Sequence, residues 1–376
     1  MLKNPPPRIG VKKQSFIGAF IKKKYGVSIR DIAANARRAL TQSTVATPCA
    51  FCSSTDGVRI STKDKFGLPA NSVVCLGCGL IRLNPRPSDR ILAEFYSGGG
   101  AFSGLYHRKL GFEHVEKALK EVLGNQFKMS ESDKRELQDF AQSAEQIMAE
   151  AEEASNKLKT YGEELVDYLR PYIAPGSSVF EVGASRGELL IDFRDKLKCR
   201  VSGLEPKASS CEEAKREHDI DLVCGFSTDE NLSISNQDVI LNLRSINHMS
   251  DPVSEFRNAW KWLKPGGLLV VSCQESIEKS KYYGWSRATV EIDHLFMFSQ
   301  RTLSACIAKA GFEILLAEVV GHYTLRKDIE SRDAWECRIL AKKTDHPEQI
   351  VVPDPIEELA NLVRNLDHFS EKHAQK

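Results

Sequence analysis

The clearest indication of the fold is SVFEVGASRGELL, residues 178–190. A run of strand-forming residues leads into a glycine turn, and the turn opens a helical pattern. Gly183 allows the backbone to turn sharply, and Gly187 allows a ligand to approach the start of the helix closely. The segment has neither a P-loop lysine nor the third glycine of a dinucleotide fingerprint. It therefore favours an uncharged or cationic adenosine compound over a pyrophosphate ligand.

Strand and helix patterns alternate after this turn. Such alternation predicts an α/β fold with a mostly parallel sheet that is covered on both faces. The last two strands have no helical pattern between them, so we expect an antiparallel hairpin at one edge. The expected strands are 177–183, 199–205, 238–243, 267–273, 312–320 and 335–343.

Two acidic residues end the first two expected strands. Ligands of open α/β sheets bind beyond the carboxyl ends of the strands, where the strand order reverses. Glu181 lies at the end of the first strand and points toward that crevice. Glu205 ends the second strand, and an acid at this place suits the two ribose hydroxyls of an adenosine.

Four cysteines form the pattern C-x₂-C-x₂₂-C-x₂-C: Cys49, Cys52, Cys75 and Cys78. Each pair brings two sulfurs into a tight knuckle, and four thiolates complete a tetrahedron around Zn²⁺. A closed set of four ligands predicts a structural site. The remaining cysteines are interpreted as small buried apolar residues, namely Cys199, Cys211, Cys224, Cys273, Cys306 and Cys337.

Four segments together resemble class I S-adenosylmethionine-dependent methyltransferases over about Ser177–Lys343. They are VFEVGASRGELL (179–190), VSGLEPKASSCEEAK (201–215), the segment from DVILNL to LLVVS (238–272), and DHLFMFSQRTLSACIAKAGFEILLAE (293–318). The resemblance implies a Rossmann-like sheet of seven strands in the order 3-2-1-4-5-7-6, with S-adenosyl-L-methionine as cofactor. The cofactor residues that it implies are Glu181, Gly183, Ala184, Gly187, Glu205, Pro206, Gly225, Phe226, Asn242, Leu243, Arg244 and His248.

The sequence departs from that family in two places. The centre of the turn is Ala184-Ser185-Arg186 rather than glycine-rich. Asn247 stands where relatives often have the glutamate of a Glu-His pair, although His248 is kept.

A narrower resemblance rests on CLGCGLIRLNPRPSDRILAEFYS, residues 75–97. This stretch is similar to methyltransferases with an N-terminal zinc ribbon in bacterial sugar and surface-polysaccharide pathways. Sugar C-methyltransferases that act on nucleotide-linked deoxysugars are among their relatives. The helical insert at about 113–160 and the basic N-terminal arm are not expected of that group.

The chain divides into five expected regions. They are a basic arm (1–45), a zinc ribbon with linker (46–96), a helical region (97–170), an S-adenosylmethionine-binding domain (171–343) and a tail with one helix (344–376). The arm carries ten Lys or Arg residues against the single Asp31, so it is either a solvated arm or a contact for anionic lipid or nucleic acid. No apolar run approaches the ~20 residues of a membrane span, and we expect a cytoplasmic protein.

A methyl acceptor with a hydroxyl or an enolisable carbon must lose a proton, and histidine is the natural base near neutral pH. His294 follows the fifth strand, in the loop where such folds place acceptor residues, and Asp293 or Glu291 is expected to orient it. His294 as a capping or packing residue is the alternative. Tyr283, with Tyr282 and Trp285, is a candidate for stacking on a sugar or base, or for packing.

Three functions are consistent with the sequence. The leading one is methyl transfer to a small-molecule or glycan acceptor, either a hydroxyl or a carbon of a nucleotide sugar or surface polysaccharide. The second is RNA methylation, in which the ribbon and the arm would bind phosphates. The third is a non-catalytic scaffold or a cofactor-sensing protein.

Overall fold

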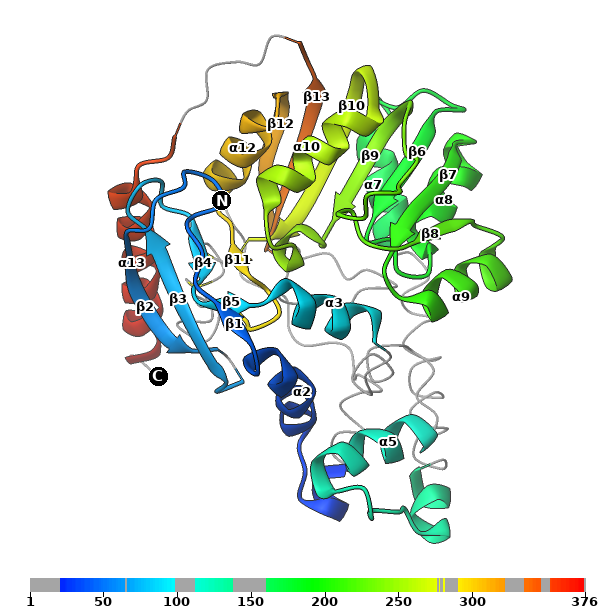
Figure 1. Ribbon diagram of the computed structural model, residues 1–376, viewed down its shortest axis with the longest axis vertical. Helices are drawn as coiled ribbons and strands as arrows, with labels where there is room; N and C mark the ends of the chain where they lie inside the picture. The colour runs from blue at the N-terminus through cyan, green and yellow to red at the C-terminus, as the bar shows by residue number, and fades with distance from the viewer. Residues whose placement is uncertain are drawn as a thin grey trace.

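A seven-stranded sheet forms the centre of the structure, a computed structural model that describes residues 21–64, 66–98, 112–137, 160–275, 277, 280, 290–321, 335–345 and 352–374 (Figure 1). The strands lie in the order β8-β7-β6-β9-β10-β13-β12. Their bounds are β6 Ser178–Val182, β7 Arg200–Glu205, β8 Leu222–Cys224, β9 Gln237–Leu243, β10 Leu263–Gln274, β12 Phe312–Gly321 and β13 Trp335–Lys343.

This order confirms the predicted topology. Numbered along the chain, the strands run 3-2-1-4-5-7-6. The five strands from β8 to β10 pair in parallel, whereas β13 is antiparallel to both β10 and β12. The expected edge hairpin is therefore present. The order reverses between β6 and β9, which is where a ligand site is expected.

Helices cover both faces of the sheet. Helices α7 (Tyr161–Leu169) and α8 (Glu188–Leu197) bury Leu165 and Phe193 in one apolar cluster. Helix α9 (Ala208–His218) lies beside β7 and β8. Helices α10 (Pro252–Trp262) and α12 (Gln300–Lys309) contribute to a second, larger cluster. Residues next to the helices cap their ends. At the start of α10, for example, the Asp251 side chain accepts a hydrogen bond from the backbone N–H of Ser254.

The zinc-ribbon segment forms a sheet of four strands in the order β11-β4-β3-β2. Its bounds are β2 Gly57–Lys63, β3 Pro69–Cys75, β4 Ile81–Leu83 and β11 Phe296–Met297. Strand β11 follows β10 in the chain, so the large domain supplies the edge strand of the small sheet. The larger apolar cluster includes residues of both parts, such as Ile81 and Phe298. The C-terminal helix α13 (Pro355–Ala374) packs against β3.

The remaining described elements precede or follow the ribbon. Helix α2 (Ile29–Arg38) begins with a capping box formed by Ser28 and Asp31 and continues into the 3₁₀ helix η1 (Ala39–Thr41). Strands β1 (Thr44–Val45) and β5 (Arg86–Pro87) form a two-stranded sheet. Helix α3 (Asp89–Ser97) follows, and α5 spans Phe112–Leu123.

Residues 21–38 and 112–137 form what we call the α2–α5 lobe, which projects from the rest of the molecule in Figure 1. The long helix expected after Leu137 falls mostly outside the described residues. Among the described helices, none combines the length and the apolar character that a membrane span requires.

Candidate functional site

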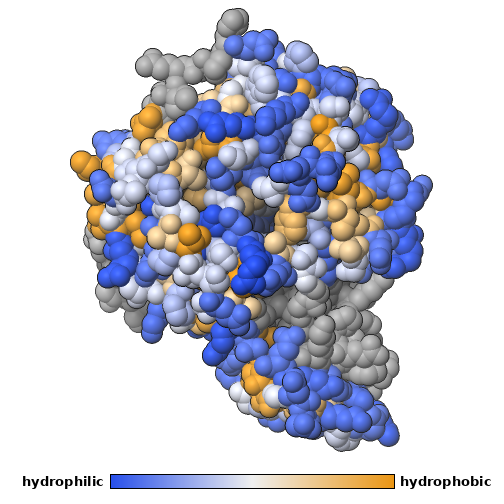
Figure 2. All heavy atoms as spheres, viewed as in Figure 1, coloured by the Kyte–Doolittle hydropathy of each residue, from blue (hydrophilic) through white to orange (hydrophobic). Residues whose placement is uncertain are grey.

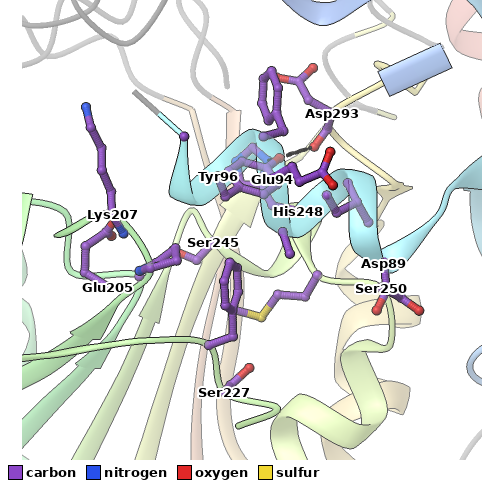
Figure 3. Close-up of a pocket in the computed structure, with 18 of the residues that line it drawn as sticks. Asp89, Glu94, Tyr96, Glu205, Lys207, Ser227, Ser245, His248, Ser250 and Asp293 are labelled. Carbon is purple, nitrogen blue, oxygen red and sulfur yellow. Dashed lines mark hydrogen bonds between the residues drawn. The ribbon is translucent and has the colours of Figure 1, made fainter. Parts of the chain in front are cut away.

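A cavity of about 1390 Å³ lies beyond the carboxyl ends of β6, β7 and β9. One wall consists of the strand ends, and the other consists of residues from α2, α3 and the end of α5. Figure 2 shows that this face of the molecule is hollowed near its centre, and Figure 3 shows α3 crossing over the strand ends with Glu94 and Tyr96 among the lining residues.

The glycine turn has the conformation that its sequence predicts. Gly183 and Gly187 have φ values of 78° and 73°, in the left-handed region that favours glycine. A Cβ on Gly183 would lie 2.9 Å from the Cβ of Ser245. Sequence reasoning missed a third required glycine, Gly203 on β7, where a Cβ would lie 2.7 Å from the main-chain oxygen of Glu181. Because Gly203 has no side chain, Ala184 can pack against β7.

Glu205 is fixed at the end of β7 by the backbone. Its carboxylate accepts hydrogen bonds from the backbone N–H groups of Ser185 (2.9 Å) and Lys207 (3.1 Å). Burial raises the pKa of Glu205, and these two hydrogen bonds oppose that shift. Glu205 also lines the cavity, as Figure 3 shows, so the side chain is oriented before any ligand binds.

Glu181 has a different environment. It is 4% exposed, and its Oε2 atom has no hydrogen-bond partner among the described residues. Burial, and then the nearby charge of Glu205, raise the pKa of Glu181 to about 8. Asn242 Oδ1 on the neighbouring strand β9 is likewise buried without a partner in the described part of the chain. Such orphaned polar atoms at adjacent strand ends suit a ligand with hydrogen-bond donors, and the cofactor's ammonium group is one.

The other predicted cofactor residues fall into two groups. Those in the cavity wall are Gly183, Glu205, Pro206, Gly225, Phe226, Leu243, Arg244 and His248. Glu181, Ala184, Gly187 and Asn242 do not line the wall; they lie in the strands and turn that form it. Arg244 directly follows β9 with a φ of 59°, which is uncommon for an arginine. The individual roles stay predictions.

His248 ends the 3₁₀ helix η2 (Ile246–His248) and lines the cavity. Its Nδ1 atom lies 2.8 Å from the main-chain oxygen of Asp293 and 2.8 Å from the Tyr96 hydroxyl, which itself donates to the same oxygen at 2.8 Å. Because a carbonyl oxygen can only accept, this arrangement favours a proton on Nδ1 and a lone pair on Nε2. Burial, and then the neighbouring His294, lower the pKa of His248 to about 4.

His294, the base predicted from the sequence, does not line the cavity wall. Its ring lies behind His248, with the ring centroids 4.4 Å apart. Glu291, one of its two expected orienting partners, has a carboxylate oxygen 3.7 Å from His294 Nδ1. A catalytic role for His294 stays a prediction. Tyr283, Tyr282 and Trp285 lie outside the described residues.

Asp293, the other expected partner, instead forms a buried ion pair with Arg37 of α2. Arg37 Nε donates to Oδ1 and a terminal nitrogen contacts Oδ2, both at 2.8 Å. Burial alone would raise the pKa of Asp293, but the charges of His294 and Arg37 outweigh it and lower the pKa. Sequence reasoning missed both Arg37 and Tyr96. Tyr96 belongs to the Phe-Tyr-Ser stretch that carries the family resemblance, whereas nothing local marks Arg37.

The four predicted cysteines meet in one cluster. Their sulfur atoms all lie within 4.8 Å of one another, with Cys49 and Cys78 separated by 3.6 Å and Cys52 and Cys75 by 3.4 Å. Tetrahedral zinc with Zn–S bonds of ~2.3 Å requires sulfur separations of about 3.8 Å, so the set fits zinc. A Cβ on Gly77 would lie 2.9 Å from Cys52 Sγ, which explains the glycine between the second pair. If these closely spaced thiols ionise, their negative charges repel one another unless a cation binds between them.

Comparison with known proteins gives consistent matches. Residues 151–317 match a family model described as a methyltransferase domain. Carboxy-S-adenosyl-L-methionine synthases of Shewanella sediminis and Shewanella pealeana are 26% and 29% identical to this chain over 120 residues. These matches cover 29% and 28% of this chain, and the chain spans about half the length of these curated relatives, 49% and 48%.

Solved structures match about half of the chain. An S-adenosylmethionine-dependent methyltransferase from Clostridium acetobutylicum is similar with a TM-score of 0.38 and 12% identity, covering 49% of this chain and 90% of that one. A TehB-like methyltransferase from Corynebacterium glutamicum has a TM-score of 0.37 and 14% identity, covering 54% and 99%. The matched family model and the strand order 3-2-1-4-5-7-6 both support a class I S-adenosylmethionine-dependent methyltransferase domain in this chain.

Proposed function

We propose that this protein transfers the methyl group of S-adenosylmethionine to a small, hydroxyl-bearing acceptor, and that the acceptor is a sugar. The observation that carries the proposal is the shared cavity. The strand-end residues Glu205 and Gly183 line it together with His248, which follows β9, and Tyr96, which comes from α3 on the other side. A donor on the strand ends and an acceptor beneath α3 would therefore meet in one cavity.

The strand ends supply the donor half of this site. Glu205 presents a fixed carboxylate to ribose hydroxyls, and the buried carboxylate of Glu181 is available to an ammonium group. The cofactor, when bound, supplies an electrophilic methyl group on a positively charged sulfur. Holding it in line with an acceptor provides much of the acceleration of such a displacement.

His248 is the candidate general base. Its Nδ1–H is held by the Asp293 carbonyl, which leaves Nε2 to accept the proton that the acceptor loses. The lowered pKa of about 4 keeps the ring neutral throughout the physiological range, so Nε2 has a free lone pair, while the same shift makes His248 a weaker base than an ordinary histidine. Tyr96 donates to the same carbonyl and restricts the orientation of the ring.

The charge of the cavity wall bears on the acceptor. Carboxylates outnumber cationic side chains in the wall by seven to four. A wall without an excess of cationic side chains lacks the basic surface that binds the phosphate backbone of RNA, and it gives the diphosphate of a nucleotide sugar no net attraction either. A neutral sugar ring does not depend on such attraction. That the acceptor belongs to a nucleotide sugar or a surface polysaccharide is inferred from the resemblance to zinc-ribbon sugar methyltransferases.

The test is methyl transfer from tritiated S-adenosylmethionine to three acceptor sets: nucleotide-linked 6-deoxyhexoses, neutral oligosaccharides and transfer RNA. We expect label in a sugar product, with mass spectrometry locating the added methyl group. Glu205→Ala should lower the rate at limiting cofactor. Label in RNA alone would contradict the proposal. Because the curated relatives are named as carboxy-S-adenosyl-L-methionine synthases, mass spectrometry of the cofactor itself would reveal a reaction on the donor instead.

A further inference from the structure

The α2–α5 lobe is a structural unit with its own apolar core. Its buried members come from both sequence segments: Ile21, Val27, Ile32, Val115, Leu119, Met129 and Leu137. Polar contacts join the same segments. Lys24 lies 2.7 Å from Asp133 and 2.7 Å from Glu136, and the Tyr25 hydroxyl donates to Asp133 at 2.9 Å. The described parts of the N-terminal arm (21–38) and of the helical insert (113–137), which have no assigned role from the sequence, therefore fold against each other.

One edge of this lobe lines the same cavity as the strand ends. Asn35 of α2, Glu121 of α5 and Asn125 of the following turn all belong to the cavity wall. Asn35 Nδ2 donates to the main-chain oxygen of Glu121 at 3.0 Å, which fixes the two segments at this edge. Within the described part of the chain, Asn35 Oδ1, the Glu121 carboxylate and the Asn125 amide make no further hydrogen bond.

The lobe is also tied to the candidate base. Arg37, on the same helix as Asn35, forms the buried ion pair with Asp293. The main-chain oxygen of Asp293 in turn contacts His248 and Tyr96. Helix α2 therefore connects the lobe edge to the place where the acceptor would lose its proton, and a molecule long enough to span the cavity would contact both.

We infer that this edge of the lobe binds the part of the acceptor that lies away from the methylated atom, and that this part is a hydroxyl-rich carbohydrate. Amide groups donate and accept, and a carboxylate accepts, so the three side chains match hydroxyls, which do both. None of the three is cationic, so a phosphate would have no charged partner here. This inference rests on the proposed function, because it names the acceptor side of the same cavity. It also makes the lobe a determinant of acceptor specificity, since a site built to hydrogen-bond hydroxyls rejects analogues that lack them.

The experiment uses the full chain saturated with S-adenosylhomocysteine and titrated by calorimetry with two probes. The probes are a thymidine-diphosphate-linked 6-deoxyhexose and a neutral trisaccharide of 6-deoxyhexoses. Asn35→Ala and Asn125→Ala should each weaken binding of the trisaccharide by about five- to tenfold, the range for one lost hydrogen bond, and should leave binding of the thymidine-diphosphate sugar within twofold. A wild type that binds only the thymidine-diphosphate sugar would overturn the inference. Affinity for S-adenosylhomocysteine should stay within twofold. Gln126→Ala is the matched control, because Gln126 is an exposed amide next to Asn125 that does not line the cavity.

If Asn35→Ala loosens the lobe, the test depends on Asn125→Ala. Among the described residues, Asn125 makes no hydrogen bond between the two segments. Probe affinities equal to wild type in both variants would overturn the inference. So would a wild type that binds neither probe, even if it transfers methyl groups to another acceptor and the proposed function stands. A wild type that neither binds S-adenosylmethionine nor transfers its methyl group would instead refute the proposed function itself.

Discussion

The two walls of the cavity are built in different ways. The cofactor wall comes from one part of the sequence, residues 181–250, where consecutive parallel strands end side by side. Main-chain geometry and the fixed carboxylate of Glu205 define it. The opposite wall combines α2, α3, the end of α5 and Asp293, which are far apart in the sequence. Its arrangement depends on side-chain pairs such as Arg37–Asp293.

Because the two walls are positioned by different parts of the chain, we expect that a substitution can disturb one wall and leave the other in place. The sheet positions the cofactor wall by itself, whereas the ribbon positions α3, because Cys78 leads through β4 and β5 directly into that helix. Unfolding of the ribbon should therefore displace Tyr96 on α3 more than Glu205 at the end of β7. The substitutions below test whether the two walls are independent, from the largest expected effect to the smallest.

Removing the zinc site should have the largest effect. Structural zinc contributes roughly 10–16 kcal/mol of apparent binding free energy in small zinc domains at pH 7, so Cys75→Ser should lower the melting temperature and release the metal. At temperatures where the sheet stays folded, methyl transfer should fall more than affinity for S-adenosylhomocysteine. Metal analysis, thermal unfolding and calorimetry measure the three quantities.

Cys224→Ser is the control for this prediction, because Cys224 is an exposed cysteine outside the cluster and its replacement should leave the zinc content unchanged. Equal losses of cofactor affinity and turnover in Cys75→Ser would show that the two walls depend on the ribbon alike.

Gly183→Val should abolish cofactor binding without touching the opposite wall. Valine strongly disfavours a φ of 78°, and its Cβ would lie 2.9 Å from the Cβ of Ser245. Calorimetry with S-adenosylhomocysteine should detect no binding. Gly176→Ala provides the matched control: Gly176 has a φ of 82° but no atom within 4 Å of an added Cβ. It should lose some stability and bind normally. Normal binding by Gly183→Val would place the cofactor elsewhere.

His248→Ala tests the candidate base, which lies at the end of η2 on the cofactor wall and contacts Tyr96 and Asp293 of the opposite wall. As a general base, His248 should contribute about 10²- to 10⁴-fold to turnover and little to cofactor affinity. Because the base must be unprotonated and its pKa is lowered to about 4, the wild-type rate at saturating cofactor should fall only as the pH drops toward 4. An acid limb near pH 6.5, the ordinary value for histidine, together with a large loss in His294→Ala, would support the sequence-based prediction of His294 instead.

These contrasts also show what the sequence could predict. The alternation of strands and helices, the glycine turn and the four cysteines follow from local patterns, because strand periodicity, turn chemistry and ligand spacing act over a few residues. The strand order is implied by the family resemblance. The Arg37–Asp293 pair joins residues separated by 256 positions, and no local pattern marks it. The position of His248 on the wall, with His294 behind it, depends on how η2 and β11 pack. The relative positions of His248 and His294 therefore follow from tertiary packing and not from a local sequence pattern.

Glu205→Ala should weaken cofactor binding by about tenfold to a hundredfold. The reason is the loss of charge-assisted hydrogen bonds to ribose hydroxyls, worth roughly 1.5–3 kcal/mol. Glu212→Ala, an exposed glutamate on the neighbouring helix α9, is the control and should bind like wild type. Calorimetry at fixed salt and pH gives both constants. If Glu205→Ala loses acceptor affinity instead, the assignment of the two walls is reversed.

Glu181 gives the smallest expected effect and the sharpest test of the cofactor wall. Its pKa is raised to about 8, first by burial and then by Glu205, so the unliganded carboxyl is mostly protonated at pH 7. If the cofactor's ammonium group binds its ionised form, binding must release a proton, and affinity should rise as the pH increases from 6 to 7.5, by at most about tenfold per unit. Calorimetry in phosphate and in Tris at pH 7 separates this proton from the binding heat. Glu181→Gln should bind without proton release and with a nearly flat pH dependence. Equal heats in the two buffers for the wild type would mean that Glu181 keeps its proton and supports the turn rather than the ligand.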